Sequence, residues 1–147
     1  SKFLLVERNP CVVVLRKFIH NYVINESMIH FTRIDSAVET YDRIMRLWQR
    51  TLETLPELPV HSVRYEKLLE DPEATLRAAC GFLGLPWQSG LQEHRESLAQ
   101  RGSIKTNSYH QVAEPLYQRS KYRWQNYREH LQPHLPILQY HIERMGY

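Results

Sequence analysis

The chain has 147 residues, of which 42% are hydrophobic and 11% aromatic, which is enough to build the core of one globular domain. No run of residues approaches the length of about 20 apolar positions that a membrane-spanning helix needs, and the first residues show no secretory signal pattern. The net charge of +3 and the pI near 8.9 favour anionic ligands, but the basic residues are scattered, so we do not expect nucleic acid as a partner.

An apolar run at the start of the chain predicts a first strand. Residues 3–6 read Phe-Leu-Leu-Val, which is typical of a parallel strand that is buried on both faces. Pro10 follows closely, and because it has no amide hydrogen and a fixed φ it suits the first turn of a helix. We expect the exposed amides and the positive end of this helix to favour phosphate. Arg8, at the same junction, has a planar guanidinium that can bind a phosphate through two hydrogen bonds.

Two helices are predicted next. The first extends from Cys11 to about Asn25, and the segment Phe31–Ile34 connects it to the second. The second helix is amphipathic, with Ser36 and Glu39 as a capping box and a proline after its last turn. The apolar positions that recur at helical spacing in it are Tyr41, Ile44, Met45, Trp48, Leu52 and Leu55. This pattern predicts a long helix that packs on an apolar surface.

A second strand and a third helix have clear boundary signals. The segment Val60–Tyr65 is short, follows a proline and is rich in strand-forming residues, so we expect a second buried strand. Asp71 and Pro72 supply the cap and the first-turn proline of the next helix, and Gly84 ends it. Two short strands cannot make a stable parallel sheet alone, so the chain is predicted to be part of a larger α/β unit.

The remaining chain predicts a polar helix at Leu91–Gln100 and an ordered loop at Ser103–Tyr117. Helical spacing resumes at Trp124, and the apolar positions that follow are Tyr127, Leu131, Leu135, Leu138, Ile142 and Met145. The five glycines are isolated, so the chain contains no glycine-rich turn that could surround a diphosphate.

The thiols and histidines do not predict a metal site. Cys11 and Cys80 lie in apolar segments and are expected to be small buried side chains. His130 and His134 have helical spacing, but a proline interrupts the turn between them. His20 lies on the first predicted helix, where a lone histidine is more often structural than a base, so no catalytic residue is assigned.

Four segments form a recognisable order along the chain. They are Arg-Asn-Pro at 8–10, Val-Arg-Tyr-Glu-Lys-Leu-Leu-Glu-Asp-Pro at 63–72, Phe-Leu-Gly-Leu-Pro-Trp at 82–87 and Arg-Ser-Lys-Tyr-Arg-Trp at 119–124. From Phe3 to about Leu131 the chain resembles the sulfotransferases that use 3′-phosphoadenylyl sulfate. It is most similar to the bacterial branch often joined to tetratricopeptide repeats, which is similar to the tyrosylprotein sulfotransferases.

The resemblance implies an α/β fold like that of the P-loop kinases. Only the C-terminal half of that fold matches: residues 1–147 would form a single partial sulfotransferase domain, mostly helical, with two short parallel strands. The loop that holds the 5′-phosphosulfate would be absent, so we expect this chain alone to be incomplete and inactive.

The resemblance also implies roles for individual residues. Arg8 matches the arginine that holds the 3′-phosphate of the cofactor, Tyr65 the tyrosine beside the adenosine, and Ser108 a serine near the nucleotide. Arg123, before a tryptophan, matches a basic residue that reaches the 3′-phosphate. Each residue also has a structural alternative. Arg8 could pair with an acid at the strand edge, and Tyr65 could be a core residue. Ser108 could cap the loop, and Arg123 could be a solvated charge on a helix, while Trp124 is expected in the core.

One position departs from the family pattern. The family usually has a serine eight residues after the arginine, and here that position is Arg16. Its guanidinium could give the 3′-phosphate a charge-assisted hydrogen bond, fill the phosphate pocket with its bulk, or point to water. Arg16 is therefore included among the candidate cofactor-binding residues.

The expected function is binding of the 3′-phosphoadenosine side of 3′-phosphoadenylyl sulfate, for sulfuryl transfer to an acceptor hydroxyl. The product of the cofactor would be 3′,5′-adenosine bisphosphate. A noncatalytic, degenerate sulfotransferase-like interaction module is the alternative, and a basic RNA-associated domain is a third reading. A missing N-terminal half or a second copy of the chain would complete the sheet. The sequence leaves the acceptor open, and of the compartments it favours the cytoplasm.

Overall fold

The computed structural model describes residues 1–20, 22–88 and 123–147. The chain forms two compact units, which we describe separately. The strand unit consists of Ser1–Glu7 and Pro59–Gln118, and the helical unit of Arg8–Leu58 and Arg119–Tyr147. The helix and the loop predicted between Leu91 and Tyr117 lie outside the described residues.

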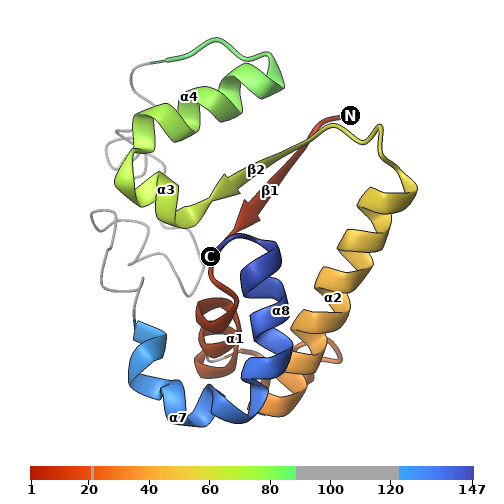
Figure 1. The fold of residues 1–147 in the computed structure, drawn as a ribbon, viewed down its shortest axis with the longest axis vertical. Helices are drawn as coiled ribbons and strands as arrows, with labels where there is room; N and C mark the ends of the chain where they lie inside the picture. The colour runs from red at the N-terminus through yellow and green to blue at the C-terminus, as the bar shows by residue number, and fades with distance from the viewer. Residues whose placement is uncertain (21, 89–122) are drawn as a thin grey trace. The chain divides into compact units, whose positions relative to one another are not determined.

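The strand unit is built on two parallel strands, β1 (Phe3–Glu7) and β2 (Val60–Arg64), which are drawn side by side in Figure 1. Phe3 lies opposite Val60, and Glu7 lies opposite Arg64. The predicted fold class, a mostly helical α/β chain with two short parallel strands, is therefore confirmed.

The predicted burial of the first strand is wrong for the described residues. Phe3 and Leu4 are each 42% exposed and Val6 is 68% exposed, while Leu5 is half-buried. In the described part of the strand unit the helices contact β2, and β1 is paired with β2 alone. An apolar run therefore identified the strand correctly, but burial needs neighbours on both faces.

Helices α3 (Tyr65–Glu70) and α4 (Pro72–Leu83) follow β2. Asp71 caps α4 as predicted, because its Oδ1 accepts a hydrogen bond from the amide of Ala74 at 2.9 Å. Gly84 ends the helix with φ of 78°, a left-handed conformation that favours glycine. Tyr65, expected at the end of the strand, is instead the first residue of α3.

Helix α4 packs against β2. The rings of Phe82 and His61 stack with their centroids 5.3 Å apart, and Lys2 donates a hydrogen bond from Nζ to the carbonyl of Phe82 at 2.6 Å. The buried apolar side chains of the described strand unit are Val63, Leu69 and Ala79. This small set gives the described part of the unit a thin core.

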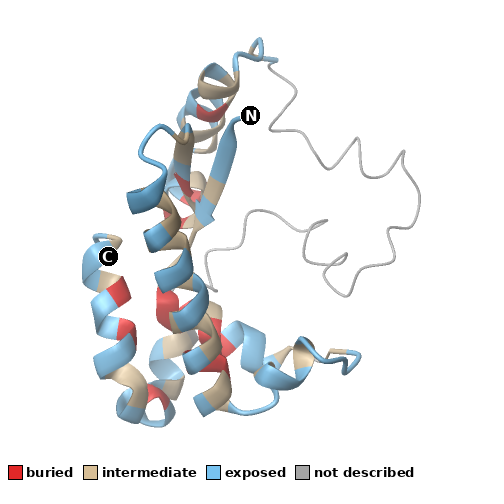
Figure 2. Cartoon of the chain, turned by 90° about the vertical axis from the view of Figure 1, so that its right-hand side faces the viewer, coloured by how far each residue is buried: buried red, intermediate tan, exposed pale blue. Residues whose placement is uncertain are grey.

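The helical unit is made of three longer helices that contact one another in every pairing, α1 (Pro10–Ile19), α2 (Ile34–Thr54) and α8 (Leu135–Arg144). Short helices complete it: η1 (Met28–Phe31), η4 (Arg123–Tyr127), α7 (Arg128–Leu131) and η5 (Gln132–His134). The core of this unit consists of Cys11, Val14, Ala37, Val38, Leu131 and Leu138. Figure 2 colours all buried residues of the chain red.

Two predicted boundaries in the helical unit are wrong. Helix α1 ends at Ile19 rather than near Asn25, because His20 adopts an extended conformation. Helix α2 begins at Ile34, before the predicted capping box, and Ser36 Oγ donates to the carbonyls of His30 and Arg33 at 2.7 and 3.1 Å instead. A serine can cap a helix only when it lies at the first boundary position.

A buried polar network joins α2 to α8. His141 Nε2 donates to Asp42 Oδ1 at 2.7 Å, and the His141 side chain is only 3% exposed. Arg46 Nε contacts both oxygens of Asp42 at 2.9 Å, and its guanidinium lies 4.7 Å from the centre of the Tyr140 ring. The network connects positions 99 residues apart.

Among the described residues, no helix combines the length and the apolar character needed to cross a membrane.

Candidate functional site

The junction between β1 and α1 holds the principal candidate, Arg8. The residue directly follows β1 in the chain and is half-buried. Asn9 is the N-cap of α1, and its Oδ1 accepts a hydrogen bond from the amide of Cys11 at 3.0 Å. Pro10 occupies the first helical position, as predicted, and is buried. The sequence Arg-Asn-Pro thus places a guanidinium immediately before a well-capped helix.

The first-turn amides of α1 are not exposed donors, contrary to the sequence prediction. The carbonyl of Asn9 accepts hydrogen bonds from the amides of Val12 and Val13 at 3.0 and 3.1 Å, and its side-chain oxygen accepts one from the amide of Cys11. Pro10 has no amide hydrogen. A phosphate at this helix end would therefore depend on side chains and on the helix dipole rather than on backbone donors.

Arg16 lies in the last turn of α1, and its side chain is exposed. A basic residue there also interacts favourably with the negative end of the helix dipole. Nothing in the geometry assigns it to a phosphate, so its cofactor role stays a prediction.

The other predicted residues are distributed over both units. Tyr65 begins α3 in the strand unit and is half-buried. Glu66, next to it, is buried at 9% exposure. Ser108 lies outside the described residues. Arg123 opens η4, and its side chain also lies outside the described part of the chain.

The structure brings η4 and α1 together. The two elements contact each other within the helical unit, although more than a hundred residues separate them in the sequence. Trp124 is half-buried and packs on the core cluster that includes Cys11 and Val14, which confirms its predicted core position. The segment that begins with Arg123 is therefore anchored on the helix that follows Arg8.

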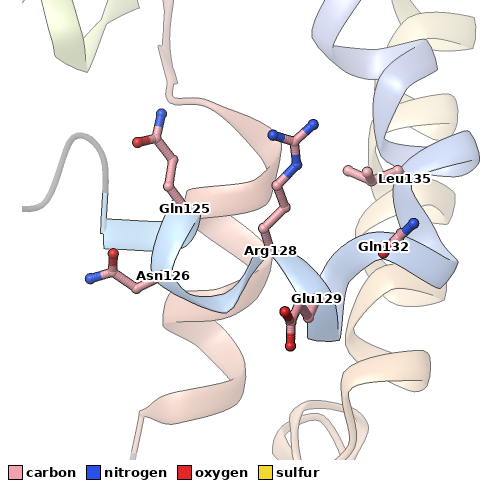
Figure 3. A pocket seen from close by; sticks show the side chains of 6 residues that line it. All are labelled: Gln125, Asn126, Arg128, Glu129, Gln132 and Leu135. Carbon is pink, nitrogen blue, oxygen red and sulfur yellow. The ribbon is translucent and has the colours of Figure 1, made fainter.

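A polar hollow of about 570 Å³ lies beside η4 in the helical unit. Its lining comes from η4, α7, η5 and the start of α8 and consists of Gln125, Asn126, Arg128, Glu129, Gln132 and Leu135 (Figure 3). The amide and guanidinium groups can donate hydrogen bonds to hydroxyl or carboxylate oxygens of a ligand, and the carboxylate of Glu129 can accept a hydrogen bond from a ligand hydroxyl. Sequence reasoning missed this hollow, because polar residues at helical spacing are typical of any solvated helix face.

The titratable groups of the helical unit do not supply an obvious base. Burial raises the pKa of the Cys11 thiol to about 11, so this thiol is not an activated nucleophile. Burial disfavours the Asp42 carboxylate, but hydrogen bonds and the charges of Arg46 and His141 outweigh it and hold the pKa of Asp42 below its ordinary value. The His20 ring lies 4.5 Å from the Tyr22 ring, centre to centre. Across the described ranges no three metal-ligating side chains gather in one place.

Comparison with known proteins assigns the chain to a family. Residues 1–89 match the sequence model of the sulfotransferase family, and this stretch is more than half of the 147 residues. The chain belongs to the sulfotransferase family. The match includes Arg8, Arg16 and Tyr65, whereas Ser108 and Arg123 lie beyond it.

Individual relatives agree with this family. The chain is 26% identical over 137 residues to "Protein-tyrosine sulfotransferase 1" of Danio rerio, which covers 84% of the chain and 35% of the relative. It is 31% identical over 119 residues to "Omega-hydroxy-beta-dihydromenaquinone-9 sulfotransferase Stf3" of Mycobacterium bovis. This alignment covers 67% of the chain and 31% of the relative. An uncharacterised protein of Aquifex aeolicus is 24% identical to the chain over 143 residues. This alignment covers 95% of the chain and 18% of that protein. The chain thus spans between about a fifth and about a third of the length of these three relatives.

Proposed function

We propose that this chain supplies the 3′-phosphoadenosine side of a sulfotransferase that uses 3′-phosphoadenylyl sulfate and transfers the sulfuryl group to a hydroxyl. The observation that carries the proposal is the sulfotransferase-family match over residues 1–89, which contains Arg8 at the junction of β1 and α1. The cofactor, when bound, supplies the activated sulfuryl group.

Arg8 is the residue that we propose to hold the 3′-phosphate. The residue is half-buried, so a phosphate bound beside it would be partly shielded from water and salt. The fork of nitrogen donors allows two parallel hydrogen bonds to phosphate oxygens, and the positive end of α1 adds a favourable dipole. Because Asn9 satisfies the first-turn amides, side chains must supply the other donors.

Further donors would come from the remaining predicted residues. Arg123 belongs to the segment that packs on α1, which supports a role beside Arg8. Arg16 and Ser108 are candidate donors to phosphate oxygens, and Tyr65 offers an aromatic ring for the adenine. The 5′-phosphosulfate side and the base for the acceptor hydroxyl would come from residues that the 147 do not include.

The acceptor is proposed to be a hydroxyl group. The names of two relatives refer to a protein tyrosine and to an ω-hydroxylated menaquinone, and both acceptors carry a hydroxyl. Sulfuryl transfer to oxygen requires positioning of this hydroxyl and stabilisation of the leaving phosphate. The residues of this chain would contribute to stabilisation of the leaving phosphate.

The test is ligand-induced stabilisation of the protein by 3′,5′-adenosine bisphosphate. A ligand at about a hundred times its Kd should stabilise the folded state by about 2.7 kcal/mol, which thermal unfolding detects. Arg8→Ala should lower the affinity for this bisphosphate by about tenfold or more, because it removes a charge-assisted contact to the 3′-phosphate. Adenosine 5′-phosphate lacks the 3′-phosphate, so its affinity should be the same for both proteins.

Arg43→Ala is the matched control. Arg43 is an exposed arginine on α2 whose ion pair with Glu39 is 3.7 Å long, so its removal tests loss of positive charge alone. The cofactor-binding proposal is wrong if the bisphosphate does not stabilise the protein. It is also wrong if Arg8→Ala and Arg43→Ala lower the affinity for the bisphosphate equally. The noncatalytic interaction module would then explain the chain better. Arg16 in place of the family serine, and first-turn amides that already have hydrogen-bond partners, would both agree with a degenerate cofactor site.

A further inference from the structure

Asn9 is the one residue between Arg8 and the first residue of α1, and three hydrogen bonds hold it in place. Its side-chain Oδ1 accepts from the amide of Cys11 at 3.0 Å. Its carbonyl accepts from the amides of Val12 and Val13 at 3.0 and 3.1 Å. The side chain and the main chain of Asn9 are therefore both fixed to the first turn of the helix.

This first turn is itself anchored in the protein. Pro10 and Cys11 are fully buried, and Val12 is 6% exposed. Cys11 belongs to the core cluster of the helical unit, together with Val14 one turn further on. Because core side chains are close-packed, a shift of this turn would disturb their contacts. The hydrogen bonds of Asn9 thus fix the residue to a rigid part of the molecule.

The backbone of Asn9 changes the direction of the chain where α1 begins. Its φ of −47° and ψ of 126° are not helical, whereas the next residue, Pro10, is the first of the helix. A side-chain bond to a first-turn amide stabilises such a cap conformation, and alanine in its place lacks this bond and favours helical angles. The Asn9 side chain therefore stabilises the direction in which Arg8 leaves the helix.

The Arg8 side chain has little freedom to compensate for a change in this direction. The residue is half-buried, and its Nε atom is buried. An exposed arginine can follow a ligand by changing rotamers, but a guanidinium whose inner nitrogen lies inside the protein has few alternative positions. The direction of its outer nitrogens consequently depends on the backbone at residues 8 and 9.

We propose that Asn9 is a positioning residue, which sets the Arg8 guanidinium in the geometry that binds a 3′-phosphate. This role rests on the proposed function of Arg8 as the phosphate ligand. Asn9 acts through Arg8 and not by touching the phosphate, because its Oδ1 is bonded to the amide of Cys11. The preference for a nucleotide with a 3′-phosphate over one without it then depends on both residues.

The ratio of two affinities tests this role. Isothermal titration calorimetry gives the affinity for 3′,5′-adenosine bisphosphate and for adenosine 5′-phosphate, and their ratio isolates the contribution of the 3′-phosphate. Asn9→Ala should lower this ratio by about fivefold or more, because Arg8 loses its geometry for a charge-assisted contact. Asn9→Ser keeps a capping oxygen, so its ratio should stay within about twofold of that of the unchanged protein.

A double-mutant cycle shows whether Asn9 acts through Arg8. In an Arg8→Ala background, Asn9→Ala should cause no further decrease of the ratio, since the residue that it positions is already absent. An additional decrease in that background would overturn the proposal, because Asn9 would then affect the phosphate independently.

Asp71→Ala is the control for loss of a helix cap elsewhere. Asp71 caps α4 in the strand unit through the amide of Ala74, so its removal breaks the same kind of bond and should leave the ratio unchanged. An equal decrease for Asp71→Ala and Asn9→Ala would overturn the positioning role. If Arg8→Ala lowers the ratio and Asn9→Ala does not, the positioning role is wrong and the cofactor proposal stands. If the unchanged protein does not prefer the bisphosphate, both proposals are wrong.

Discussion

The partly buried Asp42 carboxylate permits a quantitative prediction about stability and pH. Asp42→Asn keeps the shape of the side chain but removes the charge that pairs with His141 and Arg46. The His141 contact is the larger contribution, because the histidine side chain is 3% exposed and Asp42 is 20% exposed. A buried hydrogen bond to a charged group contributes about 1.5 to 3 kcal/mol.

The Arg46 contact should contribute less. The Arg46 side chain is 53% exposed, and this pair spans one helical turn of α2. Exposed pairs of this kind contribute about 0.3 to 0.5 kcal/mol. We therefore expect Asp42→Asn to lower the free energy of unfolding by about 2 kcal/mol near pH 7, and Arg46→Ala to lower it by less than about 1 kcal/mol.

The pH dependence follows from the lowered pKa of Asp42. A carboxyl group whose pKa is lower in the folded state stabilises the fold fully above its unfolded pKa of about 4. This contribution decreases as the pH falls through the folded pKa and the carboxylate becomes protonated. The difference between the unchanged protein and Asp42→Asn should therefore shrink as the pH falls below about 4.

Urea unfolding followed by circular dichroism at several pH values measures both quantities. Glu39→Gln is the matched control, since Glu39 lies on the same helix and pairs with Arg43 through side chains that are 61% and 81% exposed. It should change the unfolding free energy by less than about 0.5 kcal/mol. Equal costs for Glu39→Gln and Asp42→Asn, or an Asp42→Asn difference that grows in acid, would refute the reasoning.

Three further outcomes are expected. Leu138→Ala should destabilise the protein by about 3 kcal/mol in urea unfolding, because this fully buried side chain would leave a cavity in the core of the helical unit. Asp71→Ala should cost about 1 kcal/mol in the same assay, since the amide of Ala74 loses its cap, whereas an unchanged midpoint would exclude the capping role. In native protein a thiol reagent should modify half-buried Cys80 well before Cys11, which is 0% exposed and has a pKa near 11, and urea should abolish the difference.

The sequence determined the features that depend on local hydrogen bonds and steric rules. The start of α4 at Pro72 and its end at Gly84 follow from a cap, a first-turn proline and a left-handed glycine within one short segment. The start of α1 at Pro10 follows from the same kind of rule. The motif order around Arg8 and Tyr65 also sufficed to predict the family, because it needs no knowledge of contacts.

Tertiary structure decided the features that depend on partners distant in sequence. The capping box at Ser36 was a plausible local signal, yet α2 begins earlier and this hydroxyl bonds to carbonyls of the preceding turn. Ile44 and Leu55 fit the apolar stripe of α2 but remain more than half exposed. The pairing of His141 with Asp42 and the contact of η4 with α1 join residues that are about a hundred positions apart. Local periodicity cannot predict such contacts, because burial and pairing are set by which elements pack together when the chain folds.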